Sequence, residues 1–210
     1  MKVLLFNGSS NANGCTYTAL LEAANALNKE GVETEIIQVG KGAIRDCIGC
    51  SGCRKNGGKC IFDDDIVNIA IEKAKEADGF IFGSPVYYAH PSGRILSFMD
   101  RIFYANSTAF KYKPAAAIVS ARRAGTTASI DAMTKHFTIN NMPVVSSNYW
   151  PMVHGRQNTP DDVKQDIEGL QIMRILGQNM AWLLKCIELG KEKGITPQNS
   201  EDKIYTNFIR

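Results

Sequence analysis

Short apolar segments alternate with helix patterns along most of this chain, and no other feature constrains its fold as strongly. The apolar segments predict strands at residues 2–6, 79–83, 115–120 and 143–147, and a β-rich, alternating pattern predicts another at residues 34–39. Apolar residues spaced three and four apart predict helices at residues 16–29, 66–74, 92–104, 126–137 and 160–189. Right-handed crossovers between such strands place helices on both faces of a parallel sheet. The sequence therefore predicts an α/β fold.

Five such strands fit a doubly wound, flavodoxin-like sheet with the strand order 2-1-3-4-5. Ligands of these sheets bind outside the carboxyl ends of the strands, where the strand order reverses. Function is therefore expected in the loops that follow residues 6, 83 and 120. We assign residues 1–194 to one domain, with a cysteine-rich loop at 40–62, and residues 195–210 to a C-terminal arm.

Capping residues mark the beginning of two of the predicted helices. Thr159 precedes Pro160, which suits the first position of a helix because proline has no N–H to leave unpaired. Asp63, Asp64 and Asp65 precede the helix pattern that begins at residue 66, where carboxylates can accept hydrogen bonds from free amides. A metal site at these three residues is disfavoured, because no histidine or second carboxylate cluster accompanies them.

Charge and hydrophobicity exclude several kinds of partner. The chain mixes 24 basic with 21 acidic residues, so its net charge of +3 produces no field that would gather polyanions. Nucleic acid and membrane surfaces are therefore not expected as partners. The apolar run Val3–Phe6 is too short for a signal peptide, and no segment approaches the roughly 20 apolar residues of a membrane span. We expect a cytoplasmic protein.

The first loop runs from Asn7 to Thr16 directly into a predicted helix, and its residues are all small or polar. Hydroxyl groups, side-chain amides and the backbone N–H groups of a helix N-terminus suit a phosphate dianion. The loop lacks both the Gly-Lys-Ser/Thr ending of an NTPase loop and the Gly-x-Gly-x-x-Gly pattern of dinucleotide sites. ATP and a Rossmann-bound nicotinamide are therefore disfavoured, and a plain polar turn is the alternative interpretation.

The second and third loops offer groups for an aromatic ligand such as a flavin. Residues 83–93 contain Tyr87 and Tyr88, whose flat faces can pack against a ring, although they could instead only cover the core. Residues 120–126 bring Ser120, Arg122 and the backbone of Gly125 to the same edge. A cation there would stabilise a reduced flavin, whereas the alternative is an ordinary surface arginine.

These loops, followed by Ser92-Gly93 and Phe98-Met99-Asp100-Arg101, resemble the NADPH-dependent FMN reductase family of the flavodoxin-like superfamily over roughly residues 1–150. The resemblance implies that the first loop binds the FMN phosphate and that the second lies along the flavin ring. The implied phosphate contacts are Ser9, Asn11, Asn13, Cys15 and Thr16, and the implied ring contacts are Pro85, Val86, Tyr87 and Tyr88. Relatives commonly carry an arginine at the Asn11 position, so only uncharged donors would hold the phosphate here.

Four of the six cysteines form the pattern Cys47-x2-Cys50-x2-Cys53-x6-Cys60, which resembles the motif of the iron-sulfur flavoprotein branch of this family. Three thiolates at steps of three can face one centre, and the resemblance implies a [4Fe–4S] cluster beside FMN. Zinc and a cysteine loop without metal are the alternatives. Cys186 is expected to be a packed core thiol.

The leading functional hypothesis is an FMN-dependent oxidoreductase. NAD(P)H would reduce the bound FMN, and the electrons would pass to a small acceptor, such as a quinone or a free flavin, or to an iron-sulfur cluster. The alternatives are an iron-sulfur flavoprotein that acts as an electron carrier without substrate turnover, and a redox sensor. The positive net charge favours the enzyme, because flavodoxin carriers are strongly acidic as a group.

The reaction requires no catalytic side chain, since FMN itself exchanges hydride with the nicotinamide. His154 could hydrogen-bond the flavin edge, but a structural role is favoured for it and more strongly for His90 and His136. Related flavoproteins usually assemble as homodimers or homotetramers, and the arm and the cysteine loop are the expected contacts. The partner in electron transfer is a small molecule or another protein.

Overall fold

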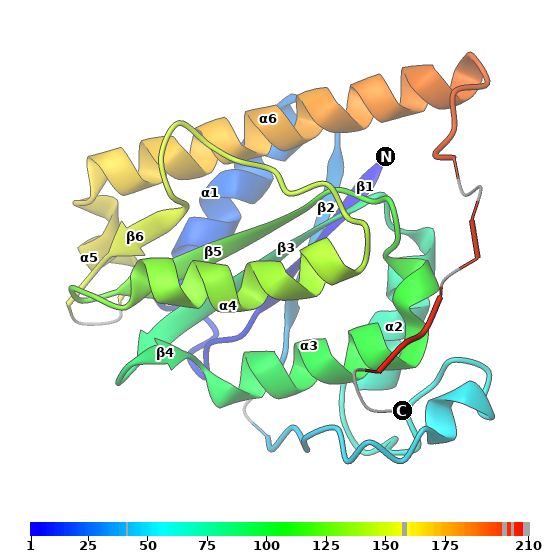
Figure 1. Ribbon diagram of the computed structural model, residues 1–210. Coiled ribbons are helices and arrows are strands. Elements are labelled where there is room, and N and C mark those ends of the chain that lie inside the picture. Colours follow the sequence, from blue (N-terminus) through cyan, green and yellow to red (C-terminus); the bar gives the residue numbers. More distant parts are fainter. Residues whose placement is uncertain (41, 157–158, 199–200, 203, 208–210) are drawn as a thin grey trace.

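The computed structural model describes residues 1–40, 42–156, 159–198, 201–202 and 204–207 (Figure 1). Its sheet has the order β2-β1-β3-β5-β6 in parallel, and the short strand β4 pairs antiparallel with β3. The strands are β1 (Lys2–Asn7), β2 (Glu33–Gln38), β3 (Gly79–Tyr87), β4 (His90–Pro91), β5 (Ala115–Ala121) and β6 (Met152–His154). The predicted α/β fold with a parallel sheet is confirmed.

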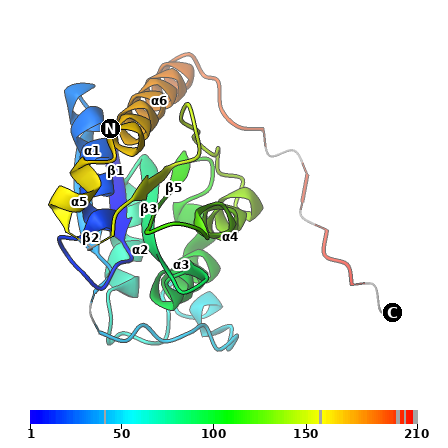
Figure 2. The ribbon, with the colours of Figure 1, turned by 90° about the vertical axis from the view of Figure 1, so that its left-hand side faces the viewer.

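Helices cover both faces of the sheet (Figures 1 and 2). One face carries α1 (Cys15–Lys29), α5 (Pro160–Lys164) and α6 (Ile167–Glu192), and the other carries α2 (Val67–Glu76), α3 (Gly93–Asn106) and α4 (Thr126–Ile139). Alternate residues of β1 divide between the two cores, because successive side chains of a strand point to opposite faces. Leu4 and Phe6 pack under α2 and α3, whereas Val3 and Leu5 pack under α1 and α6.

The strand count corrects the prediction of a five-stranded sheet, since six strands pair in the described part of the chain. Residues 143–147 do not form a strand. Pro143 has no N–H to donate, and Val144 makes only an isolated bridge to Ala115. The last parallel strand forms instead at Met152–His154. The sequence also missed that β3 continues to Tyr87 and turns back into β4.

The C-terminal helical region is two helices. Thr159 caps α5 by accepting a hydrogen bond from the N–H of Asp162, as predicted, but α5 ends at Lys164. Asp166 then caps α6 through the N–H of Gly169.

Cys186 is exposed, so the prediction of a core thiol is wrong. The buried stripe of α6 passes through Leu176, Met180 and Leu184. Two residues beyond Leu184, the helix has turned about 200°, which places Cys186 away from the core.

The C-terminal arm follows Gly194, which ends α6 with a φ of +74°. The described residues of the arm form no helix or strand, and Figure 2 shows the arm leaving the body of the molecule. Its side chains Ile204 and Tyr205 are exposed. Across the residues that the structure describes, no helix is both long enough and apolar enough to span a membrane.

Candidate functional site

The three predicted loops meet at the carboxyl edge of the sheet, and side chains tie them together. In the first loop, Ser10 Oγ lies 2.8 Å from Tyr87 Oη in the second. At the beginning of α1, Thr16 Oγ1 lies 2.8 Å from Ser120 Oγ at the end of β5. The structure therefore brings together residues that lie more than 100 positions apart in the chain.

Two glycines allow the loops to approach this closely. A Cβ atom at Gly8 would lie 2.7 Å from Cβ of Ile95 and 2.8 Å from the carbonyl oxygen of Gly83. Gly125 has a φ of +86°, and a Cβ atom there would lie 2.9 Å from Cγ1 of Val86. Neither position has room for a side chain, so each loop keeps its path against the next.

Hydrogen bonds to its own side chains set the conformation of the first loop. The N–H of Ser9 donates to Asn7 Oδ1 at 3.1 Å, and the N–H of Asn11 donates to Ser9 Oγ at 3.1 Å. The N–H of Asn13 donates in turn to Asn11 Oδ1 at 3.2 Å. These hydrogen bonds are the local turns that Asn and Ser favour, so the predicted donors Ser9, Asn11 and Asn13 also set the shape of the loop.

The side chain of Gln38 also supports the first loop, a role that was not predicted from the sequence. Its Nε2 donates to the carbonyl oxygen of Ser9 at 2.6 Å, and its Oε1 accepts from Asn7 Nδ2 at 2.6 Å. Gln38 is the last residue of β2, the neighbour of β1 in the sheet. The sequence did contain a signal for this role, because Gln38 is a polar residue at the carboxyl end of the strand next to β1.

The N-terminus of α1 points its dipole at this loop. Its N-cap Gly14 has no side chain to accept from the first-turn amides, and no acidic residue lies in the first turn. The thiol of Cys15 lies 3.8 Å from the carbonyl oxygen of Thr159, away from the loop. The positive end of the helix can therefore attract an anion through backbone N–H groups and without a cation.

The two tyrosines of the second loop face solvent rather than the core. Tyr87 is 45% exposed and Tyr88 fully exposed, so the alternative that both only cover the core is wrong. Tyr88 also has a φ of +52°, an unusual conformation for a residue with a ring. Burial favours the neutral phenol of Tyr87, but hydrogen bonds from Ser10 and Ser9 and the charge of Arg94 together outweigh it and lower the pKa of Tyr87 below its ordinary value.

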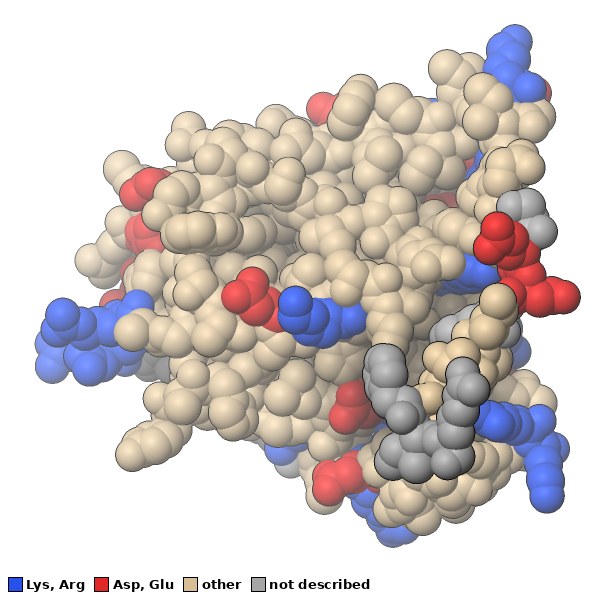
Figure 3. Space-filling view, viewed as in Figure 1, with Lys and Arg blue, Asp and Glu red and all other residues tan. Residues whose placement is uncertain are grey.

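An open hollow of about 580 Å³ lies between the second and third loops, beside Tyr88. Its other lining residues are Val86, Ala89, Ala121, Arg122, Arg123, Ala124 and Gly125. Pro85, predicted as a ring contact, is buried in β3, where it pairs with Ser120. Figure 3 shows basic side chains gathered at this end of the molecule, where the β5–α4 loop lies in Figure 1.

His154 holds the third loop in place. Its backbone N–H donates to Asp166 Oδ2 at 2.7 Å, and its Nε2 lies 3.2 Å from the carbonyl oxygen of Arg123. These contacts favour the structural role predicted for this residue. His90 and His136 contact Pro91 and Asp100, respectively.

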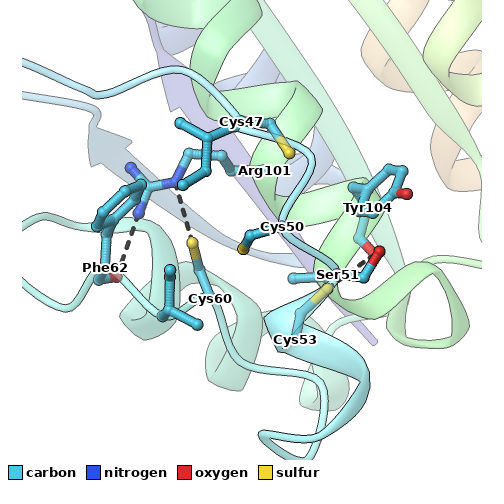
Figure 4. A pocket seen from close by; sticks show the side chains of 11 residues that line it. Cys47, Cys50, Ser51, Cys53, Cys60, Phe62, Arg101 and Tyr104 are labelled. Atoms are coloured by element: carbon cyan, nitrogen blue, oxygen red, sulfur yellow. Dashed lines mark hydrogen bonds between the residues drawn. The ribbon is translucent and has the colours of Figure 1, made fainter.

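The four cysteines of the predicted cluster motif line one pocket on the outer side of α3 (Figure 4). Cys47 and Cys50 are exposed, Cys60 is half-buried and Cys53 is buried. The enclosed space is about 20 Å³, roughly the room of one water molecule. In the described part of the chain, no three Cys, His, Asp or Glu residues converge as metal ligands do.

Polar groups contact three of these sulfur atoms. Arg101 Nε donates to Cys60 Sγ at 3.3 Å, and the N–H of Gly52 donates to Cys50 Sγ at 3.5 Å. Cys53 Sγ donates to the carbonyl oxygen of Tyr104 at 3.7 Å. Two of the sulfur atoms, those of Cys50 and Cys60, thus accept hydrogen bonds from N–H groups.

Asn68 anchors the end of the cysteine loop and was also missed at the sequence level. It accepts from the N–H of Cys60 at 2.8 Å and donates to the carbonyl oxygens of Cys60 and Phe62 at 3.0 and 3.2 Å. The predicted capping role is confirmed for Asp65, whose Oδ1 accepts from the N–H of Val67. Asp63 instead accepts from Asn68.

The parallel sheet and the loops at its carboxyl edge define a flavodoxin-like α/β protein. A flavodoxin from the domain Archaea aligns with a TM-score of 0.58 and 17% identity, covering 88% of this chain and 99% of that one. The structure of RosB with bound 8-demethyl-8-formylriboflavin-5'-phosphate aligns with a TM-score of 0.70 and 16% identity, covering 100% and 92%. At these identities the likeness shows the fold alone.

Sequence comparison identifies the family. The profile of the NADPH-dependent FMN reductase family matches residues 1–157, and the chain belongs to this family. An iron-sulfur flavoprotein of Methanocaldococcus jannaschii is 36% identical over 195 residues, covering 90% of this chain and 100% of that protein. An iron-sulfur flavoprotein of Methanosarcina thermophila is 27% identical over 198 residues, covering 92% of this chain and 100% of that protein. The resemblance predicted from the loops and the cysteine motif is confirmed.

Proposed function

We propose that this chain is an FMN-dependent oxidoreductase that takes electrons from NAD(P)H and delivers them to a small acceptor or to a cluster held by its own cysteines. The observation that carries the proposal is the joining of three polar loops at the carboxyl edge of the sheet, next to an uncapped helix N-terminus and an open hollow. This is where doubly wound sheets bind their ligands. FMN accepts two electrons from a nicotinamide and can release them singly.

The roles of the residues follow from their positions. The first loop and the N-terminus of α1 would hold the phosphate through backbone N–H groups, with Thr16 fixed by Ser120. Tyr87 and Tyr88 would pack along the flavin ring, and the hollow between the second and third loops would leave one ring face accessible. Arg122, exposed at the hollow, would place positive charge near the ring.

The cysteine pocket fits a [4Fe–4S] cluster by its donor set. Four thiols line one pocket whose other walls include Ile48, Ile61 and Ala105, and two of the sulfur atoms already accept hydrogen bonds. Four thiolates also suit zinc. Iron is favoured because the curated relatives named above are iron-sulfur flavoproteins. The pocket would have to widen when the cluster binds, because the present space is about 20 Å³.

Helix α3 connects the two candidate sites. Its N-cap Ser92 donates from Oγ to the carbonyl oxygen of Gly8 in the first loop at 2.9 Å. Nine residues later, Arg101 on the same helix contacts Cys60. A rigid helix between both sites would keep their separation constant, which suits the transfer of electrons from one to the other.

The proposal is tested on protein purified without oxygen. We expect flavin absorption, about four irons and four acid-labile sulfides per chain, and steady NADPH or NADH oxidation when a quinone or free flavin is added. Absence of flavin after incubation with FMN would exclude the proposal. Flavin without iron would restrict it to a simple reductase.

The second candidate is an electron carrier that turns over no substrate. It is favoured by the likeness to proteins named iron-sulfur flavoproteins. Under this candidate, reduced protein partners would be oxidised in stoichiometric amounts, whereas NAD(P)H would not be consumed catalytically. We further propose a cytoplasmic location, where thiols stay reduced, and a homodimer or homotetramer, to be tested by light scattering.

A further inference from the structure

Arg101 is the most unusual charged residue of the described structure. It lies on α3 with only 1% of its surface exposed, whereas buried arginines are rare unless they are paired. Its Nη1 forms an ion pair with Asp65 Oδ2, and the Asp65 side chain is 5% exposed. The guanidinium also lies over the ring of Phe62, 5.4 Å from its centroid. A charge buried this deeply requires a partner for each of its polar groups.

The remaining hydrogen bonds of Arg101 all reach the cysteine loop. Nη1 lies 3.4 Å from the carbonyl oxygen of Arg45, before the first cysteine, and Nη2 lies 3.2 Å from that of Phe62, after the last. Nε donates to Cys60 Sγ at 3.3 Å, as Figure 4 shows. One side chain therefore joins both ends of the loop and also contacts one of its four sulfur atoms.

The contact with sulfur goes beyond what anchoring requires. A neutral sulfur atom is a weak acceptor, whereas a thiolate is a good one. A hydrogen bond from a cation draws electron density from the sulfur that accepts it, and hydrogen bonds to ligand sulfurs are among the factors that set cluster potentials. Among the described residues, Arg101 is the one cationic side chain with a recorded hydrogen bond to these cysteines.

We propose that Arg101 is a positioning residue that orients Cys60 as a cluster ligand and raises the reduction potential of the bound cluster. This inference rests on the proposed function, because it requires the four cysteines to hold iron. The reduced cluster carries one more negative charge than the oxidised cluster. A buried cation that donates to a ligand sulfur stabilises the more negative form, and Asp65 partly cancels this effect.

Two substitutions are predicted to shift the potential in opposite directions. Arg101→Lys keeps the charge but loses the planar set of donors, so its hydrogen bond to Cys60 should be lost and the potential should fall. Asp65→Asn leaves Arg101 in place and removes its compensating charge, so the potential should rise. A merely structural anchor would weaken iron binding in both variants without opposite shifts.

The experiment is an anaerobic redox titration, followed by electron paramagnetic resonance, on reconstituted full-length protein. The reduction equilibrium constant should change about tenfold in each variant, which corresponds to about 59 mV for one electron. Arg174→Lys is the matched control, because Arg174 pairs with Glu22 at 2.6 Å on the opposite face of the sheet. The FMN content of each variant shows whether it is folded. If Arg101→Lys does not fold, the potential of Asp65→Asn alone tests the inference.

Each outcome has a defined meaning. Opposite shifts in the two variants, or a rise in Asp65→Asn when it is measured alone, support the inference. Unchanged potentials, or shifts in the same direction, overturn it and leave the cluster in place. If the wild-type chain binds FMN but no iron, the proposed cluster is excluded and the inference falls with it.

Discussion

The carboxyl edge of the sheet and the cysteine pocket are built by different means. At the edge, residues from separate elements meet through uncharged hydrogen bonds, such as those of Ser10 with Tyr87 and of Thr16 with Ser120. Among its described residues, the cysteine loop contains only a 3₁₀ turn at Gly52–Arg54, and it depends on buried polar anchors from α2 and α3. The comparison teaches that topology positions the first site, whereas a few side chains position the second. Substitutions should therefore affect the two regions separately.

The largest expected effect is loss of iron from the cysteine pocket. Cys60→Ser removes one of the four thiols, so iron should fall from about four per chain to nearly none. FMN content should not change, because the three loops of the sheet edge do not include Cys60. Metal analysis and flavin absorption of the same sample measure both. Cys186→Ser, at an exposed position outside the loop, is the control, and parallel loss of flavin would show that the two regions are coupled.

The next largest effect is expected at Gly8, where the added Cβ would contact Ile95 and Gly83 at 2.7 and 2.8 Å. Gly8→Ala should lower the free energy of unfolding by about 1–3 kcal/mol through overpacking. It should also weaken FMN binding at least about tenfold, since the first loop would be displaced. Denaturant unfolding and fluorescence titration with FMN provide the measurements. Gly42→Ala is the control, because nothing lies within 4 Å of its added Cβ.

Asn68 provides the corresponding test of the cysteine loop. Asn68→Ala leaves the N–H and carbonyl of Cys60 without this partner and should cost about 1–2 kcal/mol of stability. Amide hydrogen exchange should rise in residues 45–62 but not in residues 7–16. Asn28→Ala, at an exposed position that accepts from Thr34, should change neither. Faster exchange in both segments would contradict the separation of the two regions.

The smallest effect is expected for Tyr87→Phe, which removes only the hydroxyl that contacts Ser10. FMN affinity should fall less than about tenfold, by roughly 1 kcal/mol. Because hydrogen bonds lower the pKa of Tyr87, its phenol should ionise at lower pH than an ordinary tyrosine. Ultraviolet titration of the FMN-free protein should show this early ionisation, and Tyr87→Phe should remove it. An identical titration curve in the variant would contradict the hydrogen-bonded geometry. The ionised phenol of Tyr87 stabilises the folded state only above the ordinary tyrosine pKa, and this contribution is lost as the pH falls through the lowered pKa. It therefore does not change the stability of the protein at neutral pH.

Local patterns were enough to predict most of the elements. The strands at residues 2–6 and 115–120 are apolar runs that end in polar loops, and the structure has β1 and β5 there. The same reasoning failed at residues 143–147, because the pairing of an edge strand depends on which backbone groups its neighbour still offers. Ala115 offers Val144 a single bridge, whereas residues 119–121 pair with β6.

The sequence by itself determined the α/β class, the three loops and the spacing of the four cysteines, because these depend on periodicity and on neighbouring residues. Only the tertiary structure decided that Gln38 supports the first loop and that Tyr87 reaches Ser10. It also decided that Arg101, forty-one residues beyond Cys60, donates to that sulfur atom. Such contacts join segments that are distant in the sequence. The sequence does not show whether an arginine is buried or exposed, because only the packing of the folded chain removes it from water.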